Sequence, residues 1–204
     1  MSVLARALEN PQIFAVQQKI CNNYKNFGVE FSDFLSKPAL DIIDVGCSTG
    51  TCAKTVIDMK RHRYTGIDIS PPYVAAASKR PNGGRFLRMD AREMSFPDES
   101  FDLAMYVGVL HHMDDETAKA CLRETRRVLR RDGHILVAEP VFTPGDWLST
   151  FFLSRDRGQY IRSESGYHAL FGELGLVRER YFRMAVHRFC SFVYSRESQQ
   201  TTGQ

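Results

Sequence analysis

The sequence predicts an α/β fold with a doubly wound, mostly parallel sheet, and three observations lead to this prediction. From Leu40 onwards, short β-branched runs alternate with helical stretches. These runs are apolar along nearly their whole length, which is typical of parallel strands that carry helices on both faces. The 204 residues match one domain with a full core, and the chain contains no internal repeat.

The first 38 residues have a helical pattern that ends at Pro38. Their apolar positions are spaced by three or four, so they form one stripe on a helix face, which needs a partner surface. The stripe consists of Ile13, Val16, Ile20, Tyr24 and Phe27. We therefore predict an N-terminal helical cap over residues 1–38.

The central part of the chain, residues 40–140, is predicted to contain five strands joined by helices. The strands are Asp41–Val45, Arg63–Ile67, Arg85–Arg88, Leu103–Val107 and His134–Ala138. The helices are Thr51–Met59, Pro72–Lys79 and Glu116–Arg131. The third helix is apolar on one side and charged on the other, and Gly133 follows it where a C-cap glycine belongs.

After Glu139 the alternation lapses into a longer connection over residues 140–165. The remaining predicted elements are a helix at Glu164–Leu174, ended by Gly175, and two strands at Leu176–Phe182 and Phe189–Tyr194. We expect the two strands to pair as an antiparallel hairpin at one sheet edge. The polar residues 196–204 are predicted to form a disordered tail.

Composition and charge exclude several classes of protein. The 27 basic and 24 acidic residues leave a net charge of +3, which is no signature of a nucleic-acid binder. The five cysteines are scattered without a C-x-x-C pair, so neither a disulfide framework nor a structural zinc site is expected. No signal peptide and no apolar run long enough to span a membrane is visible, and we expect a cytoplasmic protein.

The strongest chemical signal is a glycine-containing turn at the end of the first predicted strand, DIIDVGCSTG over Asp41–Gly50. In open α/β sheets, ligands bind at the carboxyl ends of the strands, where a helix N-terminus follows. Gly46 and Gly50 allow a sharp turn and a close approach of a ligand to the backbone. A turn of this kind also occurs for purely structural reasons.

Acidic residues stand at three successive strand ends. Asp44 lies in the first strand's turn, Asp68 ends the second strand 18 residues after Gly50, and Asp90 follows the third strand. A carboxylate at such a position accepts hydrogen bonds from ribose hydroxyls. The glycine spacing differs from the G-x-G-x-x-G of a dinucleotide site, and an acid in the turn favours a ligand that carries an ammonium group over a diphosphate. We therefore predict a nucleoside ligand.

Together these motifs resemble the class I S-adenosylmethionine-dependent methyltransferases of the small-molecule type, and within them the family of domains called methyltransferase domain 11. The resemblance covers about residues 40–140 and rests on DVGCSTG, GIDIS, MDAREMSFPDESFD, VGVLHHM and RRVLRRDGHILVAEP, in this order. It implies a Rossmann-like seven-stranded sheet of order 3-2-1-4-5-7-6, with the last strand antiparallel. It also implies S-adenosyl-L-methionine as the cofactor and S-adenosyl-L-homocysteine as its product.

The resemblance implies a role for each matching residue. The turn of Asp44, Gly46, Cys47, Ser48 and Gly50 would hold the methionine end of the cofactor. On the nucleoside side, Asp68 would bind the ribose hydroxyls, Ile69 would pack on the adenine, and Asp90 would meet the adenine amine beside the Ala91 backbone, while Val107 would line the methionine side. No metal is implied.

Ser48 departs from the family pattern, which usually has glycine there. If this position needs a positive φ, serine is strained by about 1 kcal/mol or more. We expect an allowed φ at Ser48, with its hydroxyl contacting the turn. Weaker cofactor binding is the alternative.

Candidate catalytic residues follow the fourth and fifth strands. Methyl transfer to a hydroxyl needs a base for the departing proton, and a histidine near its ordinary pKa of about 6.5 serves at neutral pH. His111 and His112 follow the fourth strand, and Glu139 ends the fifth strand at the same edge. In some relatives the matching residues do this work, so His112 or His111 is the candidate base, oriented by Glu139. The alternative is that these residues only pack the turn.

The connection after the fifth strand is the predicted substrate lid, residues 141–165. Its aromatic and basic residues indicate a partly apolar acceptor with an anionic group. These residues are Trp147, Phe151, Phe152, Tyr160, Arg155, Arg157 and Arg162, with Tyr167 and His168 as further candidates. Two alternatives stay open. In the first, the segment WLSTFFLS would lay an apolar face on a membrane surface, which would suit a quinone-like acceptor. In the second, its aromatic residues only cover the sheet edge.

Two further patterns are interpreted as structural. The run Ser70-Pro71-Pro72-Tyr73 resembles a motif of base-methylating enzymes, but it follows the second strand rather than the fourth, so Ser70 is expected to cap a helix that a proline opens. The arginines at positions 123, 126, 127, 130 and 131 are interpreted as the solvated face of one helix rather than a nucleic-acid stripe.

From this pattern we expect one methyltransferase domain over residues 1–195, with a cofactor-binding core at 40–140. The expected activity is S-adenosylmethionine-dependent methyl transfer to a small-molecule acceptor, on a hydroxyl of a metabolite, sugar or natural-product intermediate. The alternatives are an RNA or other nucleic-acid methyltransferase and a catalytically silent cofactor-binding module. We expect a monomer or homodimer without a nucleic-acid partner.

Overall fold

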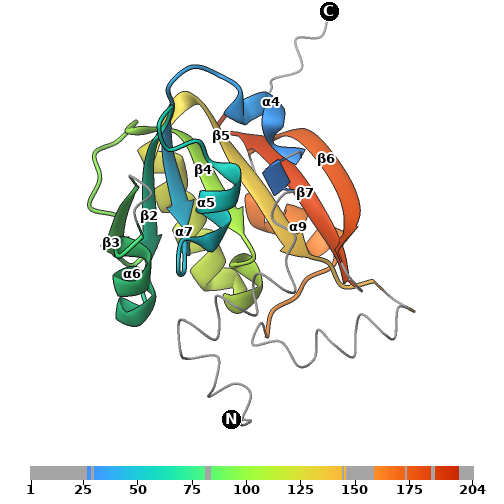
Figure 1. Ribbon diagram of the computed structural model, residues 1–204. Helices are drawn as coiled ribbons and strands as arrows, with labels where there is room; N and C mark the ends of the chain where they lie inside the picture. The colour runs from blue at the N-terminus through green and yellow to red at the C-terminus, as the bar shows by residue number, and fades with distance from the viewer. Residues whose placement is uncertain are drawn as a thin grey trace, which may run out of the picture.

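The computed structural model describes residues 27–28, 30–80, 84–143, 145, 159–172, 174–184 and 187–197. Most of the predicted N-terminal cap, most of the predicted lid and residues 198–204 of the predicted tail lie outside this part of the chain. The prediction that the disordered tail begins at residue 196 is wrong for Arg196, whose guanidinium donates to Glu99 at 2.9 Å and to the Leu129 carbonyl at 2.7 Å. The described residues form one sheet with helices on both of its faces (Figure 1).

The sheet has seven strands in the order β3-β2-β1-β4-β5-β7-β6. The strands are β1 (Asp41–Val45), β2 (Arg63–Asp68), β3 (Arg85–Arg88), β4 (Phe101–Val107), β5 (Leu129–Pro140), β6 (Gly175–Met184) and β7 (His187–Ser195). Strands β1 to β5 pair in parallel, and β7 pairs antiparallel with both β5 and β6. The predicted fold class, strand order and edge hairpin are confirmed.

The described helices are α4 (Ser32–Leu35), α5 (Thr51–Val56), α6 (Pro71–Ser78), the 3-10 helix η1 (Leu110–His112), α7 (Asp115–Val128) and α9 (Glu164–Phe171). Helices α7 and α9 begin at residues whose side chains cap them. The Asp114 side chain accepts the Thr117 N–H at 2.8 Å, and Ser163 does the same for Gly166 at 3.2 Å. None of the described helices is long and apolar enough to cross a membrane.

Two apolar cores lie on opposite faces of the sheet. On β1, Ile42 packs in the core beneath α5 and α6, whereas the next residue, Ile43, packs in the core beneath α7 and α9. Successive side chains of a strand point to opposite faces, so both must be apolar when both faces are covered. Figure 1 shows α5 in front of the sheet and α7 behind it, with the parallel strands pointing towards the bottom of the view. That lower edge is where the carboxyl ends meet.

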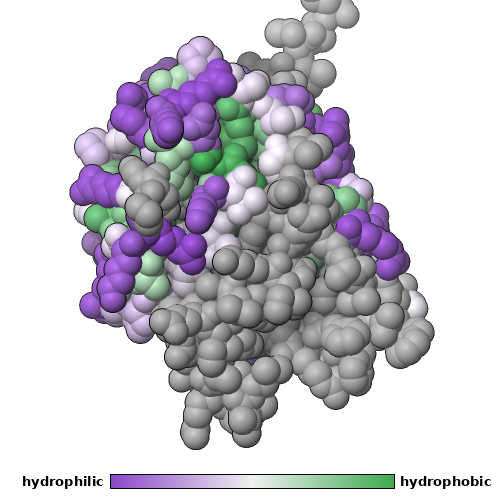
Figure 2. Space-filling view, in the orientation of Figure 1, coloured by the Kyte–Doolittle hydropathy of each residue, from purple (hydrophilic) through white to green (hydrophobic). Residues whose placement is uncertain are grey.

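Polar side chains cover most of the described surface on one side of the molecule. In Figure 2 they surround a short apolar strip in the upper part of the face, away from the carboxyl edge of the sheet. This distribution is ordinary for a folded domain, so the surface in this view points to no particular ligand.

Two helix ends differ from the prediction. Helix α7 ends at Val128 and the chain enters β5 directly, so Gly133 lies within β5 and is no C-cap. A Cβ placed there would lie 2.8 Å from the Arg130 carbonyl oxygen, which explains why glycine stands at this irregular point of the strand. Helix α9 ends at Gly172, with a φ of 51°, and Gly175 instead begins β6.

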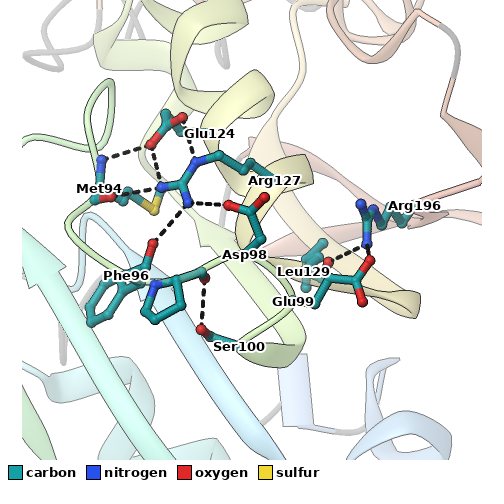
Figure 3. Close-up of polar contacts among 10 residues, drawn as sticks. Met94, Phe96, Asp98, Glu99, Ser100, Glu124, Arg127, Leu129 and Arg196 are labelled. Carbon is teal, nitrogen blue, oxygen red and sulfur yellow. Dashed lines mark hydrogen bonds and ion pairs between the residues drawn. The ribbon is translucent and has the colours of Figure 1, made fainter.

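The prediction of a solvated helix face holds for Arg123 and Arg126, which are exposed on α7, but not for the rest of the arginine run. Arg127 of α7 binds Glu124, Asp98 and the carbonyl oxygens of Met94 and Phe96, and thereby ties the loop before β4 to the helix (Figure 3). Residues 130 and 131 belong to β5, where Arg130 pairs with Asp41 at 3.0 Å and Asp102 at 2.6 Å. These charges hold elements of the chain together.

Candidate active site

The predicted site residues gather along the carboxyl edge of the parallel strands. Asp44, Asp68, Val107 and Glu139 lie near the ends of β1, β2, β4 and β5, and Asp90 follows β3. Because these five strands are neighbours in the sheet, their ends form one continuous rim, at the bottom of Figure 1.

The turn after β1 needs glycine at two positions. Gly46 and Gly50 have φ values of 74° and 69°, in the left-handed region. A Cβ placed on Gly46 would lie 2.3 Å from the Val109 side chain, and one on Gly50 would lie 2.9 Å from the Phe86 ring. The turn after β1 is therefore packed directly against the loop after β4, which carries the histidines.

Most amide groups of this turn donate to the protein itself. The N–H groups of Gly46 and Cys47 donate to the Ile67 carbonyl at 2.8 and 3.0 Å, and the Gly50 N–H donates to the Cys47 carbonyl at 2.9 Å. The Ser48 N–H donates to Asp68 Oδ2 at 2.9 Å. Amides in use cannot cradle a diphosphate, so the turn favours a ligand that binds to acids and carbonyls.

Ser48 has a φ of 50°, so the expectation of an allowed φ is wrong. A left-handed conformation costs a non-glycine residue about 1–2 kcal/mol, and the bond from its N–H to Asp68 holds it in place. The expected contact of its hydroxyl with the turn is wrong as well. Within the part of the chain that the structure describes, Ser48 Oγ is buried and has no hydrogen-bond partner. A buried hydroxyl without a partner is costly, which marks this atom as a candidate ligand contact.

Asp44 is only 3% exposed and accepts a hydrogen bond from the phenol of Tyr64, at 2.5 Å from O–H oxygen to Oδ2. Burial raises the pKa of Asp44 to about 7, the Tyr64 hydrogen bond opposes this rise, and the nearby charge of Asp68 adds to it. Burial likewise raises the pKa of the Cys47 and Cys52 thiols, with a further contribution from Asp44. Both cysteines are therefore neutral packing residues.

Asp68 is fixed at the end of β2 by two backbone amides. Its Oδ2 accepts from Ser48, and its Oδ1 accepts from Ser70 at 2.8 Å. Burial raises the pKa of Asp68 above its ordinary value, and these hydrogen bonds oppose the rise. The adjacent Ile69 is 63% exposed, as expected of a side chain that packs on a ligand. Ser70 stands at the N-cap of α6 with Pro71 opening the helix, although its side chain makes no capping bond.

Asp90 is more restricted than predicted. Arg92 donates to it from the guanidinium at 2.7 Å and from the backbone N–H at 2.9 Å, and this ion pair lowers the pKa of Asp90. Any contact with an adenine amine would have to share the carboxylate with Arg92. Ala91 is half-buried against the core beneath α7, and Val107 is half-buried at the end of β4.

The structure brings Glu139 and His111 together. Glu139 is fully buried, its Oε1 accepts the N–H groups of Val109 and Leu110 at 2.8 Å each, and its Oε2 lies 2.7 Å from His111 Nδ1. His112 is exposed, and its ring centroid lies 4.1 Å from that of His111. The carboxylate therefore contacts the inner histidine, while the outer histidine faces away from the core.

Arg162 does not face an acceptor as predicted. Its guanidinium donates to the carbonyl oxygens of Leu110, Met113 and Tyr160 and to the Asp115 carboxylate, at 2.7 to 3.0 Å. It therefore fixes the loop after β4 that carries His111 and His112, the histidine loop, to the segment before α9. The other predicted lid residues with basic or aromatic side chains, at positions 147, 151, 152, 155 and 157, lie outside the described residues.

The two further acceptor candidates on α9 are also engaged elsewhere. Tyr167 is buried, and its hydroxyl donates to the Pro140 carbonyl at 3.1 Å. His168 Nδ1 lies 2.6 Å from the Tyr194 hydroxyl, and its Nε2 lies 3.3 Å from Glu179. Neither residue is placed to meet an acceptor at the histidine loop.

Sequence reasoning missed Tyr64 and the structural role of Arg162. A tyrosine inside an apolar buried strand needs a hydrogen-bond partner, and Asp44 on the neighbouring strand could have been recognised as that partner. No local signal marks Arg162, because its contacts with Leu110, Met113 and Asp115 lie 47 to 52 residues away in the chain. No group of three or more potential metal ligands occurs among the described residues.

Comparison with known proteins is consistent with this geometry. Residues 42–133 match a family model described as a methyltransferase domain. The chain is 33% identical over 105 residues to 2-methyl-6-phytyl-1,4-hydroquinone methyltransferase of a Synechocystis species, covering 50% of this chain and 32% of that protein. It is 31% identical over 109 residues to 27-O-demethylrifamycin SV methyltransferase of Amycolatopsis mediterranei, covering 50% of this chain and 39% of that protein. The chain thus matches less than half the length of these relatives.

The fold has solved counterparts. The crystal structure of an S-adenosylmethionine-dependent methyltransferase from Methanosarcina mazei aligns with a TM-score of 0.70 at 16% identity. The alignment covers 83% of this chain and 98% of that one. At this identity the likeness concerns the fold alone.

Proposed function

We propose that this chain, whose residues 42–133 match a methyltransferase domain, is a class I S-adenosylmethionine-dependent methyltransferase that transfers a methyl group to a hydroxyl of a small, partly apolar acceptor. The observation that carries the proposal is the contact between the cofactor turn and the histidine loop at Val109. The side chain of Val109 fills the space beside Gly46, and its N–H binds Glu139, which in turn contacts His111. A cofactor held by the turn would therefore lie next to the candidate base.

The residues of the turn fit the cofactor. The Ser48 hydroxyl, buried and without a partner among the described residues, would bind the amino-acid end of S-adenosylmethionine, and Asp44 supplies negative charge for its ammonium group. Asp68 would accept the ribose hydroxyls and Ile69 would cover the adenine. The remaining predicted contacts are those of Asp90 and Ala91 with the adenine and of Gly46, Cys47, Gly50 and Val107 with the methionine end.

When bound, the cofactor would supply a methyl group on a sulfonium sulfur; the acceptor oxygen would take this methyl in line, and the sulfur would leave as the thioether of S-adenosylhomocysteine. The protein's part is then to align the two and to take the hydroxyl proton. With the Glu139 carboxylate accepting the Nδ1 proton of His111, the basic nitrogen of that ring is Nε2. Glu139 is a positioning residue in this scheme, since it fixes the ring and the two amides at the start of η1.

Exposed aromatic residues beside the histidine loop support an acceptor with an apolar part. Phe142, three residues after Glu139, is 42% exposed, and Tyr160 is 41% exposed. The Tyr160 N–H donates to the His111 carbonyl at 3.0 Å, so this aromatic residue lies directly at the loop. Among the relatives, one is named for a hydroquinone and one for an O-demethylated natural product, which makes phenolic hydroxyls the first acceptors to try.

The test replaces each histidine singly by alanine and measures methyl transfer from labelled S-adenosylmethionine to a panel of phenols and hydroquinones. For the variant that lacks the base we expect kcat to fall by about 10²- to 10⁴-fold, with the affinity for S-adenosylhomocysteine unchanged. His168→Gln, a histidine of α9 that binds Tyr194, is the matched control and should retain full activity.

Unchanged turnover in both His111→Ala and His112→Ala would remove the catalytic role of the pair. Binding of S-adenosylhomocysteine without turnover on any acceptor would instead favour the silent cofactor-binding module. A nucleic-acid acceptor would show itself as a mobility shift that weakens with added salt.

A further inference from the structure

We propose that Tyr64 is a positioning residue for the cofactor: its phenol holds one carboxylate oxygen of Asp44, so that the other oxygen meets the ammonium group of the cofactor's amino-acid end. The inference rests on the proposed function, because it concerns the same turn. It assigns a role to a residue of β2 that lies outside every motif of the turn.

The geometry of the pair is tight and well supported. Tyr64 and Asp44 are each 3% exposed, and their hydrogen bond of 2.5 Å joins the neighbouring strands β1 and β2. The Tyr64 ring packs against Phe86 with 5.6 Å between the centroids, and a Cβ on Gly84 would lie 2.8 Å from its Cδ1. The phenol is therefore confined on its apolar sides, and the Asp44 oxygen that it binds is fixed.

The second oxygen of Asp44 differs from the first. Among the described residues, Tyr64 supplies the one hydrogen bond that Asp44 accepts. Within the described part of the chain, no hydrogen bond to Asp44 Oδ1 is found, so this oxygen can still accept one from a ligand. The carboxylate is thus anchored at one oxygen, while the other oxygen has the capacity to accept from a ligand.

Among the residues that the structure describes, no cationic side chain contributes to the pKa of Asp44. Tyr64 and Asp68 face it from β2, and Cys47 and Cys52 face it from the turn and α5. In the sheet its neighbours in register are Gly66 on β2 and Met105 on β4. None of these groups is cationic, so an ammonium ion at the open oxygen would be the compensating charge.

A dependence of binding on pH follows. Burial raises the pKa of Asp44 to about 7, so its carboxyl is partly protonated at neutral pH. An ammonium ligand favours the ionised carboxylate, so binding releases a proton and the affinity rises with pH up to about 7. The Tyr64 phenol stabilises the ionised form, so its removal raises the pKa of Asp44 further.

The experiment measures the dissociation constant of S-adenosylhomocysteine by calorimetry from about pH 5.5 to about pH 8. It uses the wild type, Tyr64→Phe and Asp44→Asn, and thermal unfolding confirms that each variant is folded. Tyr64→Phe removes one oxygen atom and keeps the ring packing. The control ligand is methylthioadenosine, which has the nucleoside but lacks the amino-acid end.

For the wild type we expect the affinity to fall by up to about tenfold for each pH unit below the Asp44 pKa. In Tyr64→Phe the inflection moves to higher pH, so that affinity at neutral pH falls by about five- to tenfold and partly recovers at the highest pH. Asp44→Asn binds weakly with no inflection below the pKa of the ligand's own amine, and methylthioadenosine binds all three proteins alike at every pH.

Three results would overturn the inference. One is wild-type binding that does not vary with pH below about 7, and another is a uniform loss in Tyr64→Phe with the inflection unmoved, which indicates a packing role only. The third is a failure of the wild type to bind S-adenosylhomocysteine at any pH, which overturns the proposed function as well. The first two leave the proposed function standing.

Discussion

The two halves of the carboxyl edge differ in how fully their buried polar groups are hydrogen-bonded. On the β1–β2 side, Ser48 is strained with a hydroxyl that has no partner among the described residues, and Ile69 is exposed. On the β4–β5 side, Glu139 accepts from Val109, Leu110 and His111, and a single arginine binds four oxygen-bearing partners around the loop.

This difference indicates that the β1–β2 side is arranged to bind a ligand, whereas the polar groups of the β4–β5 side already bond to one another. Strain and orphaned polar atoms persist where a bound partner offsets their cost, whereas fully bonded buried carboxylates hold backbone in one arrangement. The cofactor side should therefore respond to ligand, and the histidine side should respond to mutation through the stability of the fold. Three predictions test this contrast, starting with the largest effect.

The first compares two carboxylates, one from each side. Glu139→Gln should lower the free energy of unfolding by about 3 kcal/mol, because the amide cannot accept from all three buried donors. Asp68→Asn should change it by less than about 1 kcal/mol, since the loss of one hydrogen bond is offset by the loss of a buried charge. Urea unfolding measures both, with the exposed Glu116→Gln as control. Equal losses for Glu139→Gln and Asp68→Asn would erase the contrast.

The second prediction concerns the ligand. S-adenosylhomocysteine at about 100 times its dissociation constant should stabilise the protein by about 2.7 kcal/mol, which corresponds to a rise in Tm of about 5 to 10 °C. The rise should persist in His112→Ala and vanish in Asp68→Asn. Differential scanning fluorimetry provides the measurement. A rise in Tm that vanished in His112→Ala would contradict the prediction, because it would place the ligand on the β4–β5 side of the carboxyl edge.

The third prediction has the smallest effect and concerns Ser48. Ser48→Gly should stabilise the ligand-free protein by about 1 kcal/mol, because glycine adopts the left-handed conformation without strain. It should also weaken S-adenosylhomocysteine binding several-fold through loss of the hydroxyl. Ser48→Ala separates the two effects, since it keeps the strain and loses the hydroxyl. Cofactor binding that is unchanged in both variants would show that the hydroxyl has no ligand role.

The fold could be predicted in detail because its signals are local and periodic. Apolar runs of strand length, glycine at the turn after β1 and the family resemblance led to the correct strand order, and strands β1 and β3 have the predicted bounds. Errors occurred where the end of an element depends on a distant contact. The prediction placed a C-cap at Gly133, because only packing shows that β5 begins directly after α7.

The sequence by itself determined the sheet, the glycine turn and the row of acids at the strand ends, because neighbouring residues in the chain decide periodicity and turn geometry. The tertiary structure alone decided which side chains meet: Asp44 with Tyr64, Glu139 with His111, and Arg162 with the loop after β4. These partners lie 20 to 52 residues apart in the chain, so no local pattern records them. Only packing shows which buried polar atoms are satisfied and which, like Ser48 Oγ, are not.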